Sequence, residues 1–428
     1  MKRSRRGKPP AAPPLLAAID CGTSAIKAGL IDPEGRLRAF ALCPAPLMLH
    51  KDGRVETDAD MTLACALKCL ADCAATPGVD ARRVAGLAVT NQRATLVCSD
   101  GRGRATGPAI VWQDMRGRED VNAFRRIVPD RAYFQMTGLP NHPVFTLGKI
   151  LWVHRQHRSS WRRVRHFGLL QDYLLRAMGA EDFWCDHSNA SLTGLLDVAR
   201  LDWSEAILKA ARLSPEELPR LVPSGRVVGA LSAAAASATG LPRGVPLVSG
   251  GGDQQCAGLG AGAAEAGVVV VCLGTAAAPL CGAERVRRDP LMRVTCCAHA
   301  IPGRWNVEGL QNCAGSALQW FRRATAGPGR FSREEMAEAG RVPPGARGAL
   351  FYPYLDGAGA PHWDPKATGM LLGLRMTHDR ATLLRAVMEG VSLETREILD
   401  VFKALKLPCR EIRVTGGCSE IETWNRVL

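Results

Sequence analysis

The stretch "LLAAIDCGTSAIKAGLIDPEGRLRAFAL", residues 15–42, decides the predicted fold. It holds two apolar runs on either side of a Gly-Thr-Ser turn, and a third run follows the turn-forming segment "DPEGR". Short apolar runs separated by turn residues are typical of strands that pair with their neighbours. The stretch therefore predicts a β-meander and not a strand followed by a helix.

A second stretch, "GVVVVCLGTAAAPL" (residues 267–280), has the same plan of strand, Gly-Thr turn and strand. The doubled hairpin suggests two similar halves, each with its own phosphate-binding turn. Between them, residues 84–114 predict three more strands in the style of the first stretch. Helical patterns cover residues 147–157, 171–178, 203–211 and, with a sustained apolar face, 381–405.

Residues 248–262, "VSGGGDQQCAGLGAG", place an acid directly behind three glycines, where a buried strand gives way to a helical segment. Glycine-rich loops bind phosphate because successive backbone N–H groups converge on one point. Neither G-x-x-x-x-G-K-[ST] nor G-x-G-x-x-G occurs here, and Asp253 would repel a phosphate at close range. The residues alone leave two interpretations of Asp253 open: a carboxylate with a functional role, or an acid that stabilises the N-terminus of a helix.

The segment "DCGTSAIK" is a better phosphate-binding candidate. Gly22, Thr23 and Ser24 offer backbone donors and two hydroxyls, and Asp20 can hold Mg²⁺ through water. Lys27 lies close enough to stabilise phosphoryl charge. A plain hairpin turn with a surface lysine is the structural alternative. Gly274 and Thr275 form the second such turn.

Composition excludes several classes of protein. The chain has 428 residues, 46% hydrophobic and 22% charged, which suffices for two globular domains. Its net charge of +14 suits an anionic ligand, but no interleaved aromatic and basic pattern points to nucleic acid. Its 15 cysteines are irregularly spaced, and Cys65, Cys69 and Cys73 share one helix face, which indicates core packing and not a disulfide or zinc framework. With no secretory segment and no membrane-length apolar run, we expect a reduced, cytoplasmic protein.

The ordered motifs resemble those of the FGGY carbohydrate kinases, which include glycerol kinase, xylulokinase, ribulokinase and gluconokinase. The resemblance covers residues 15–428. "AIDCGTSAIKAGL" and "CLGTAAAP" are similar to the two phosphate motifs, and "SGGGDQQCAGLGAG" to the catalytic segment. "GLAVTNQRATLV" and "PAIVWQDMR" match the sugar side, and "AGSALQWF" and "RVTGGCSEIETW" match the adenosine side.

The resemblance implies an α/β fold of two ribonuclease H-like (actin-like ATPase) domains that flank a cleft. We expect a disordered basic tail at residues 1–14, a sugar-binding domain at 15–265 and a nucleotide-binding domain at 266–428. Family members continue with another strand and helix, so the resemblance also implies a second domain that is incomplete at its C-terminus, from a fragment or a truncated protein.

The implied activity is transfer of the γ-phosphate of ATP to a hydroxyl of a small sugar or polyol, with Mg²⁺ and with Asp253 as the general base. The implied residues fall into three groups. Asp20 helps to hold the metal. The substrate is contacted by Gln92, Arg93, Trp112, Asp253 and Gln254. ATP is contacted by Gly22, Thr23, Ser24, Lys27, Gly274, Thr275, Gly315, Gln319, Gly416 and Gly417.

Two departures from the family pattern bear on function. Glycerol kinases carry Arg-Glu where this chain has Arg93 and Ala94, and the Ala94 side chain accepts no hydrogen bond. Xylulokinases have Met-His in the same segment, where this chain has Gln-Arg, so the acceptor stays open between a ketopentose such as xylulose and a glycerol-like polyol. A catalytically impaired, actin-like nucleotide-binding protein with a regulatory or scaffold role is the alternative. A homodimer is the expected assembly, with no membrane or nucleic-acid partner.

Overall fold

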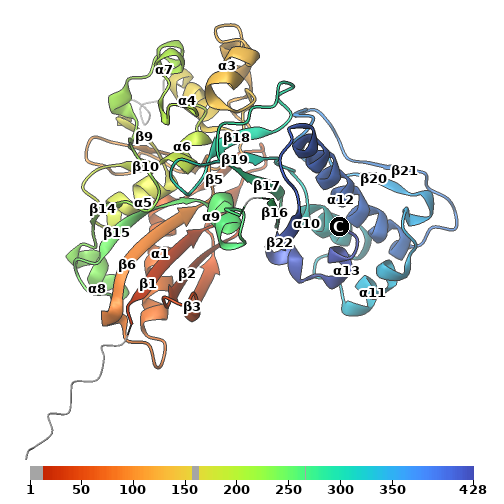
Figure 1. Ribbon diagram of the computed structural model, residues 1–428, viewed down its shortest axis with the longest axis horizontal. Coiled ribbons are helices and arrows are strands. Elements are labelled where there is room, and N and C mark those ends of the chain that lie inside the picture. Colours follow the sequence, from red (N-terminus) through yellow and green to blue (C-terminus); the bar gives the residue numbers. More distant parts are fainter. Residues whose placement is uncertain (1–12, 157–162, 266) are drawn as a thin grey trace, which may run out of the picture. The chain divides into compact units, whose positions relative to one another are not determined.

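The computed structural model describes residues 13–156, 163–265 and 267–428, which form two compact units (Figure 1). The first unit comprises residues up to 116 together with 152–189 and 215–253. The second comprises residues 117–151, 190–214 and 254–428. Residues 1–12 of the predicted tail lie outside the described residues. Each unit is discontinuous in sequence, and the boundary at residues 265/266 stays a prediction.

The first unit is built on a six-stranded sheet with the order β14-β15-β6-β1-β2-β3. Strand β1 pairs antiparallel with β2, and β2 pairs antiparallel with β3, which confirms the predicted meander. On its other side β1 pairs parallel with β6, and β6 pairs parallel with β15. The strands are β1 (Leu15–Cys21), β2 (Ala25–Ile31), β3 (Leu37–Pro44), β6 (Val84–Asn91), β14 (Val227–Ala230) and β15 (Pro246–Gly252).

Helix α1 (Ala59–Ala74) packs against this sheet, beside α8 (Ala233–Thr239) (Figure 1). Its start is fixed by Asp58, whose side chain accepts hydrogen bonds from the N–H groups of Asp60 and Met61. Cys69 and Cys73 are buried on its inner face, and their thiols donate to the carbonyls of Ile26 and Ala28 on β2. With Cys65 half-buried on the same face, the predicted cysteine stripe is confirmed as core packing.

The three strands predicted within residues 84–114 are present but do not form a second meander. Strand β6 joins the first sheet, whereas β7 (Leu96–Ser99) and β8 (Ala109–Ile110) belong to a separate five-stranded sheet, β4-β5-β8-β7-β9. Its other members are β4 (Leu47–Leu49), β5 (Val55–Thr57) and β9 (His166–Leu169). Between β6 and β7, Ala94 has a φ of 56°, which breaks the extended backbone and turns the chain out of the first sheet.

The second unit contains a five-stranded sheet with the order β18-β19-β17-β16-β22. Strand β16 pairs antiparallel with β17 across the Gly-Thr turn and parallel with β22, as β1 does with β2 and β6. This repetition confirms the predicted doubling of the hairpin. The strands are β16 (Val268–Leu273), β17 (Ala277–Ala283), β18 (Thr295–Ala298), β19 (Trp305–Glu308) and β22 (Glu411–Thr415).

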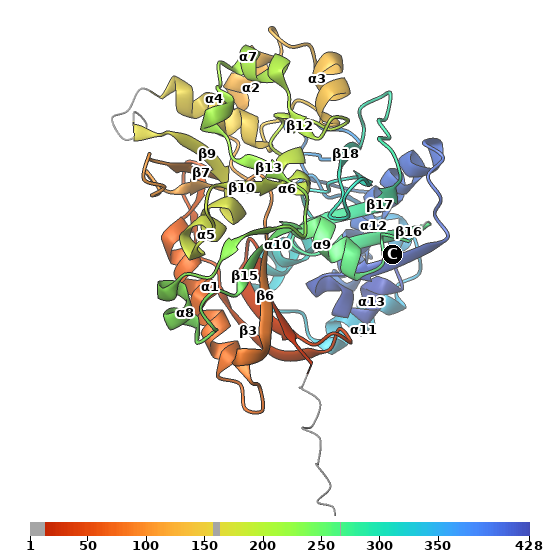
Figure 2. The same ribbon diagram turned by 60° about the vertical axis from the view of Figure 1, so that its left-hand side comes forward.

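Helix α12 (Arg380–Ala404) is the longest helix of the second unit and confirms the pattern over residues 381–405. It packs beside α10 (Gly315–Ala326) and α11 (Arg333–Arg341) (Figure 2). The side chain of Asp379 caps its start by accepting from the N–H of Thr382. The helical segment predicted within residues 248–262 is α9 (Asp253–Gly260), which ends before Gly262.

The remaining elements are short. Helices predicted near residues 147–157, 171–178 and 203–211 correspond to α4 (Thr146–Arg155), α5 (Leu170–Met178) and α7 (Glu205–Ala211). The others are α2 (Arg118–Phe124), α3 (Asp130–Thr137), α6 (His187–Ser191), α13 (Glu422–Asn425), β10 (Trp184–Asp186), β11 (Leu196–Asp197), β12 (Asp202–Trp203), β13 (Arg220–Val222), β20 (Leu350–Tyr352) and β21 (Met370–Leu372). Among the described residues, no helix has the length and apolar character that crossing a bilayer requires.

Glu394 on α12 makes the stability of the second unit depend on pH. Its side chain is buried and accepts a hydrogen bond from Gln311 Nε2 at 3.2 Å. Burial outweighs this hydrogen bond and raises the pKa of Glu394 to about 8. The unfolded chain loses this proton near pH 4, so stability falls between about pH 4 and 8, by at most roughly 1.4 kcal/mol per pH unit.

We expect Glu394→Gln to remove this dependence, and to stabilise the protein at pH 8 but not at pH 4. Urea unfolding of both proteins from pH 4 to 8.5 measures the effect. Asp400→Asn is the matched control, because Asp400 lies on the same helix with an exposed side chain paired to Arg396. Equal pH slopes for wild type and Glu394→Gln would contradict the assignment.

Candidate functional site

Arg93 and Asp253 meet at the ends of two adjacent parallel strands of the first unit. Gly252, the last residue of β15, pairs with Asn91, the last residue of β6, so the residues that follow emerge together. Arg93 Nε donates to Asp253 Oδ1 at 3.2 Å. The Arg93 side chain is 10% exposed and that of Asp253 is 28% exposed. The carboxylate is therefore balanced by a cation and still accessible to a small ligand.

A β-bulge at Gly250 precedes Asp253. Ser249 and Gly251 pair with the consecutive residues Val89 and Thr90 on β6, which leaves Gly250 as an extra residue. A Cβ at Gly250 would lie 1.8 Å from the carbonyl oxygen of Val89. Only glycine allows this approach, so the first of the three glycines serves strand pairing and not phosphate binding.

The first phosphate turn connects β1 to β2 and is joined to the predicted sugar side. Gly22 N–H closes the turn by donating to the carbonyl of Ala25 at 3.1 Å. The Thr23 hydroxyl donates to Gln92 Oε1 at 3.0 Å and accepts from Trp112 Nε1 at 2.9 Å. Three predicted residues from three segments are thus connected through one hydroxyl, and Ser24 beside them is exposed.

Asp20 and Lys27 lie opposite each other on β1 and β2, at either side of this turn. Lys27 Nζ donates to Asp20 Oδ2 at 2.9 Å, and both side chains are partly exposed, at 45% and 33%. An exposed ion pair of this kind adds little to stability. The pair lies beside a turn in which Ser24 is exposed, and this position suits the neutralisation of phosphate charge.

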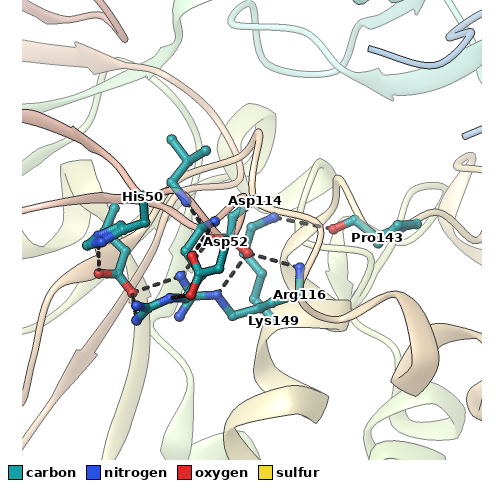
Figure 3. Close-up of polar contacts among 9 residues, drawn as sticks. His50, Asp52, Asp114, Arg116, Pro143 and Lys149 are labelled. Atoms are coloured by element: carbon teal, nitrogen blue, oxygen red, sulfur yellow. Dashed lines mark hydrogen bonds and ion pairs between the residues drawn. The ribbon is translucent and has the colours of Figure 1, made fainter. Parts of the chain in front are cut away.

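The segment that carries Trp112 is held by a buried charge network (Figure 3). Arg116 donates to both Asp114 and Glu56, and the Asp114 carboxylate also accepts from the N–H of Val55 at 2.7 Å. Burial alone would raise the pKa of Asp114, but its hydrogen bonds from Arg116 and Val55 lower that pKa below the ordinary value. Asp114 therefore has a structural role, because it holds this segment in place. His50 also belongs to this network, because its Nε2 lies 3.0 Å from Glu56 Oε2.

The second phosphate turn, at Gly274 and Thr275, is enclosed by two other segments of the second unit. At the start of α10, Gly315 N–H donates to Gly274 O and Ser316 N–H donates to Thr275 O, at 2.9 and 3.1 Å. A Cβ at Gly315 would lie 2.7 Å from Gly274 O. Gly416 follows β22 with a φ of 93°, and a Cβ there would lie 2.6 Å from Leu273 O.

The predicted residues thus form two groups, one in each unit. In the first unit, hydrogen bonds or strand pairing join Asp20 with Lys27, Thr23 with Gln92 and Trp112, and Arg93 with Asp253. In the second, Gly274, Thr275, Gly315 and Gly416 converge. Gly417 faces open space, Gln319 is exposed on α10, and Gln254 is the second residue of α9.

Sequence reasoning missed a contact that a third segment makes with Gly252, the residue before Asp253. Gly252 N–H donates to Ser188 Oγ at 2.9 Å, and Ser188 follows the fully buried Asp186. The only signal was the polar run "CDHSNAS" between buried segments, which single-sequence patterns do not separate from a surface loop. The Arg93–Asp253 pair was not predicted either, because 160 residues separate its partners.

Known proteins resemble the chain over nearly its whole length. The family model for the N-terminal domain of the FGGY family of carbohydrate kinases matches residues 15–260, and that for the C-terminal domain matches residues 269–428. Xylulose kinase of Escherichia coli strain K12 is 32% identical over 97% of this chain and 84% of its own length. Glycerol kinase of Trichlorobacter lovleyi is 31% identical over 95% of this chain and 82% of its own.

Solved structures agree. The crystal structure of a xyloylose kinase from Brucella ovis is 26% identical with a TM-score of 0.87, and covers 96% of this chain and 84% of that one. That of xylulose kinase from Rhodospirillum rubrum is 27% identical with a TM-score of 0.85, again over 96% and 84%. The chain therefore belongs to the FGGY family of carbohydrate kinases, and is an ATP-dependent kinase of a sugar or polyol.

Proposed function

We propose that the protein phosphorylates a ketopentose such as xylulose, with Asp253 as the general base. The Arg93–Asp253 pair carries the proposal, because it sets a partly exposed carboxylate beside a nearly buried cation at the end of two parallel strands. Named xylulose kinases at 32% and 29% identity support the choice of acceptor. Because the named relatives are kinases, nothing in the comparisons favours a non-catalytic scaffold.

In the proposed mechanism, Asp253 takes the proton of the attacking hydroxyl as its oxygen approaches the γ-phosphorus. Arg93 orients the carboxylate through its hydrogen bond to Oδ1. The turn at Gly22, Thr23 and Ser24 presents backbone and hydroxyl donors to the transferring phosphate. In the second unit, the turn at Gly274 and Thr275 holds the β- and γ-phosphates, and Gly416 and Gly417 let adenosine lie against the backbone.

Magnesium fits the residues near the first turn. Mg²⁺ in phosphoryl-transfer sites is held by one or two carboxylates and by phosphate and water oxygens, so Asp20 with its single carboxylate is sufficient. An ion held there would neutralise phosphate charge during the transfer. Lys27, which pairs with Asp20 at 2.9 Å, would add a positive charge beside the same turn. Gln319 on α10 is the proposed contact to the ribose or base.

Glycerol is the second candidate acceptor, favoured by the 31% identity to glycerol kinases. Ala94 argues against it, because its methyl group accepts no hydrogen bond and is 4% exposed. Gln92, Trp112 and Gln254 are the proposed contacts to the carbon skeleton and remaining hydroxyls. Gln92 already holds the Thr23 hydroxyl at 3.0 Å, so acceptor binding and phosphate binding share one polar chain.

A coupled assay of ADP release against ketopentoses, glycerol, gluconate and aldopentoses tests the acceptor. We expect the highest kcat/KM for a ketopentose and a value at least 10-fold lower for glycerol, the size of effect that a missing hydrogen bond produces. A higher value for glycerol overturns the choice of acceptor and leaves the kinase class intact. Turnover by Ala94→Glu with glycerol then shows whether residue 94 sets the preference.

Gly417 offers a direct test of the adenosine side. An added Cβ would meet no atom within 4 Å, and its φ is not in the left-handed region. We expect Gly417→Ala to weaken ADP binding about 10-fold by crowding the nucleotide, with an unchanged melting temperature. Isothermal titration calorimetry and thermal unfolding measure both. Gly260→Ala is the control, since that position is equally open and lies on α9. Unchanged ADP affinity in Gly417→Ala would remove Gly417 from the site.

We also propose a cytoplasmic location and a homodimer. None of the 15 cysteines, all within the described ranges, forms a disulfide, which suits a reducing compartment. Sedimentation of the purified protein measures its assembly, and a monomer at micromolar concentration would exclude the dimer. No nucleic-acid partner is proposed.

A further inference from the structure

Asp186 is a fully buried carboxylate at the end of β10 in the first unit. Its Oδ1 accepts from the N–H groups of Ser188 and Asn189, at 2.9 and 3.2 Å. Its Oδ2 accepts from Gln171 Nε2 and Asn189 Nδ2, at 2.9 and 2.7 Å. Within the described part of the chain, no lysine or arginine pairs with it. Only neutral donors in that part of the chain form hydrogen bonds with this buried acid. Burying a carboxylate without a paired cation costs desolvation free energy, which indicates that Asp186 has a specific role.

Ser188 connects this acid to the catalytic strand. The Ser188 hydroxyl donates to Asp186 Oδ1, and Ser188 Oγ in turn accepts from Gly252 N–H at 2.9 Å. Because the hydroxyl hydrogen of Ser188 points at the Asp186 carboxylate, a lone pair of Ser188 Oγ is directed at the Gly252 N–H. Gly252 is the last residue of β15, and Asp253 is the next residue.

The end of β15 needs this support. On the side away from β6, strand β14 pairs with β15 only from Pro246 to Val248. Ser249 still forms backbone hydrogen bonds with Gly225 and Arg226 on that side, and the three glycines that follow it are the most conformationally free residues. The Ser188 hydroxyl supplies a hydrogen bond to this glycine segment at Gly252, the residue before the acid.

We propose that Asp186 and Ser188 are positioning residues that fix the backbone of Gly252 and so aim the Asp253 carboxylate at Arg93 and the acceptor hydroxyl. The proposal rests on the proposed role of Asp253. Neither residue is catalytic, because each acts through Gly252. A purely structural role, capping of the short helix α6, is the competing explanation.

Ser224 provides a matched control. Its hydroxyl donates to the same Asp186 Oδ1, at 3.3 Å, but it does not contact Gly252. Ser224→Ala therefore removes a donor from the acid and keeps the link to the catalytic strand. Ser188→Ala removes both the donor and the link. Ser188→Thr keeps the hydroxyl, and Ser188→Cys fills the volume with a weak acceptor.

The experiment combines hydrogen–deuterium exchange of the peptide spanning residues 248–256 with steady-state kinetics. In Ser188→Ala we expect faster exchange in this peptide and a kcat lower by about 10- to 100-fold, since small misplacements of a catalytic group have effects of this size. The KM for ATP should change less than about twofold, because the adenosine side lies in other segments. Ser188→Thr should recover kcat, and Ser224→Ala should match wild type in both measurements.

Equal effects of Ser188→Ala and Ser224→Ala, or a lower kcat with unchanged exchange, overturn the proposal. If Ser188→Ala does not fold, Ser188→Cys gives the same comparison. In an Asp253→Asn background, Ser188→Ala should lower the residual rate no further. If Asp253→Asn alone keeps full turnover, the proposed base is wrong, whereas the exchange data still decide whether Ser188 holds Gly252.

Discussion

Asp253→Asn is expected to lower kcat by about 10³-fold while ADP binding is retained, because a positioned general base contributes roughly 10²- to 10⁴-fold. The amide keeps an oxygen that can accept from Arg93 Nε, so we expect the 3.2 Å contact and the structure around it to be retained. It cannot take a proton from the acceptor hydroxyl. Single-turnover phosphorylation and calorimetric ADP binding separate the chemical step from nucleotide affinity.

Asp182→Asn is the matched control for this substitution. Asp182 forms the same kind of pair, with Arg220 Nε at 3.0 Å, but on the surface of the same unit, where the two side chains are 44% and 70% exposed. We expect its kcat within twofold of wild type, since exposed pairs contribute little. Full turnover by Asp253→Asn would remove the base from the mechanism.

Gly250→Ala is expected to have the largest effect on folding. Its methyl group would lie 1.8 Å from the carbonyl oxygen of Val89, and backbone atoms of a central strand cannot move aside as a side chain can. Overpacking in a core usually costs about 1–3 kcal/mol, and a clash with backbone belongs at or above the upper end. We expect a melting temperature lower by more than about 6 °C, or failure to fold.

Gly86→Ala separates this effect from the general cost of changing a strand glycine. Gly86 lies on β6, and a Cβ there would make ordinary contacts at 3.8 and 3.9 Å with Leu16 and Val248. We expect a change in stability below about 1 kcal/mol. Thermal and urea unfolding of the two variants give the comparison. A stable Gly250→Ala protein would show that β15 and β6 separate more easily than the pairing indicates.

Local patterns predicted the elements better than their pairing. The meander, the strand before Asp253 and α12 follow from apolar periodicity and turn residues, which act within a few positions. The assignment of β6 and β7 to different sheets does not, because it depends on the backbone turn at Ala94, and a single alanine gives no sign of a positive φ. Cys69 and Cys73 were placed correctly because their spacing alone fixes the helix face.

The candidate site shows the same limit. The turns that contain Gly22 with Thr23 and Gly274 with Thr275 were predicted from the sequence because each is a continuous segment between two strands. The hydrogen bonds that join Thr23 to Gln92 and Trp112 span 69 and 89 residues, and no local pattern encodes them. Ser188 was missed for the same reason: its role exists only once β15 has been placed 64 residues later.

The bulge at Gly250 also has a consequence for how this protein can change by insertion or deletion. Side chains of a strand alternate between the two faces of its sheet, and residues paired across adjacent strands face the same side. Deleting one glycine between Val248 and Asp253 would remove the bulge and leave Gly251 opposite Thr90 and Gly252 opposite Asn91, with the acid on its present face. A second deletion would have no unpaired residue to remove and would turn the acid to the other face, so the segment tolerates the loss of one residue and no more.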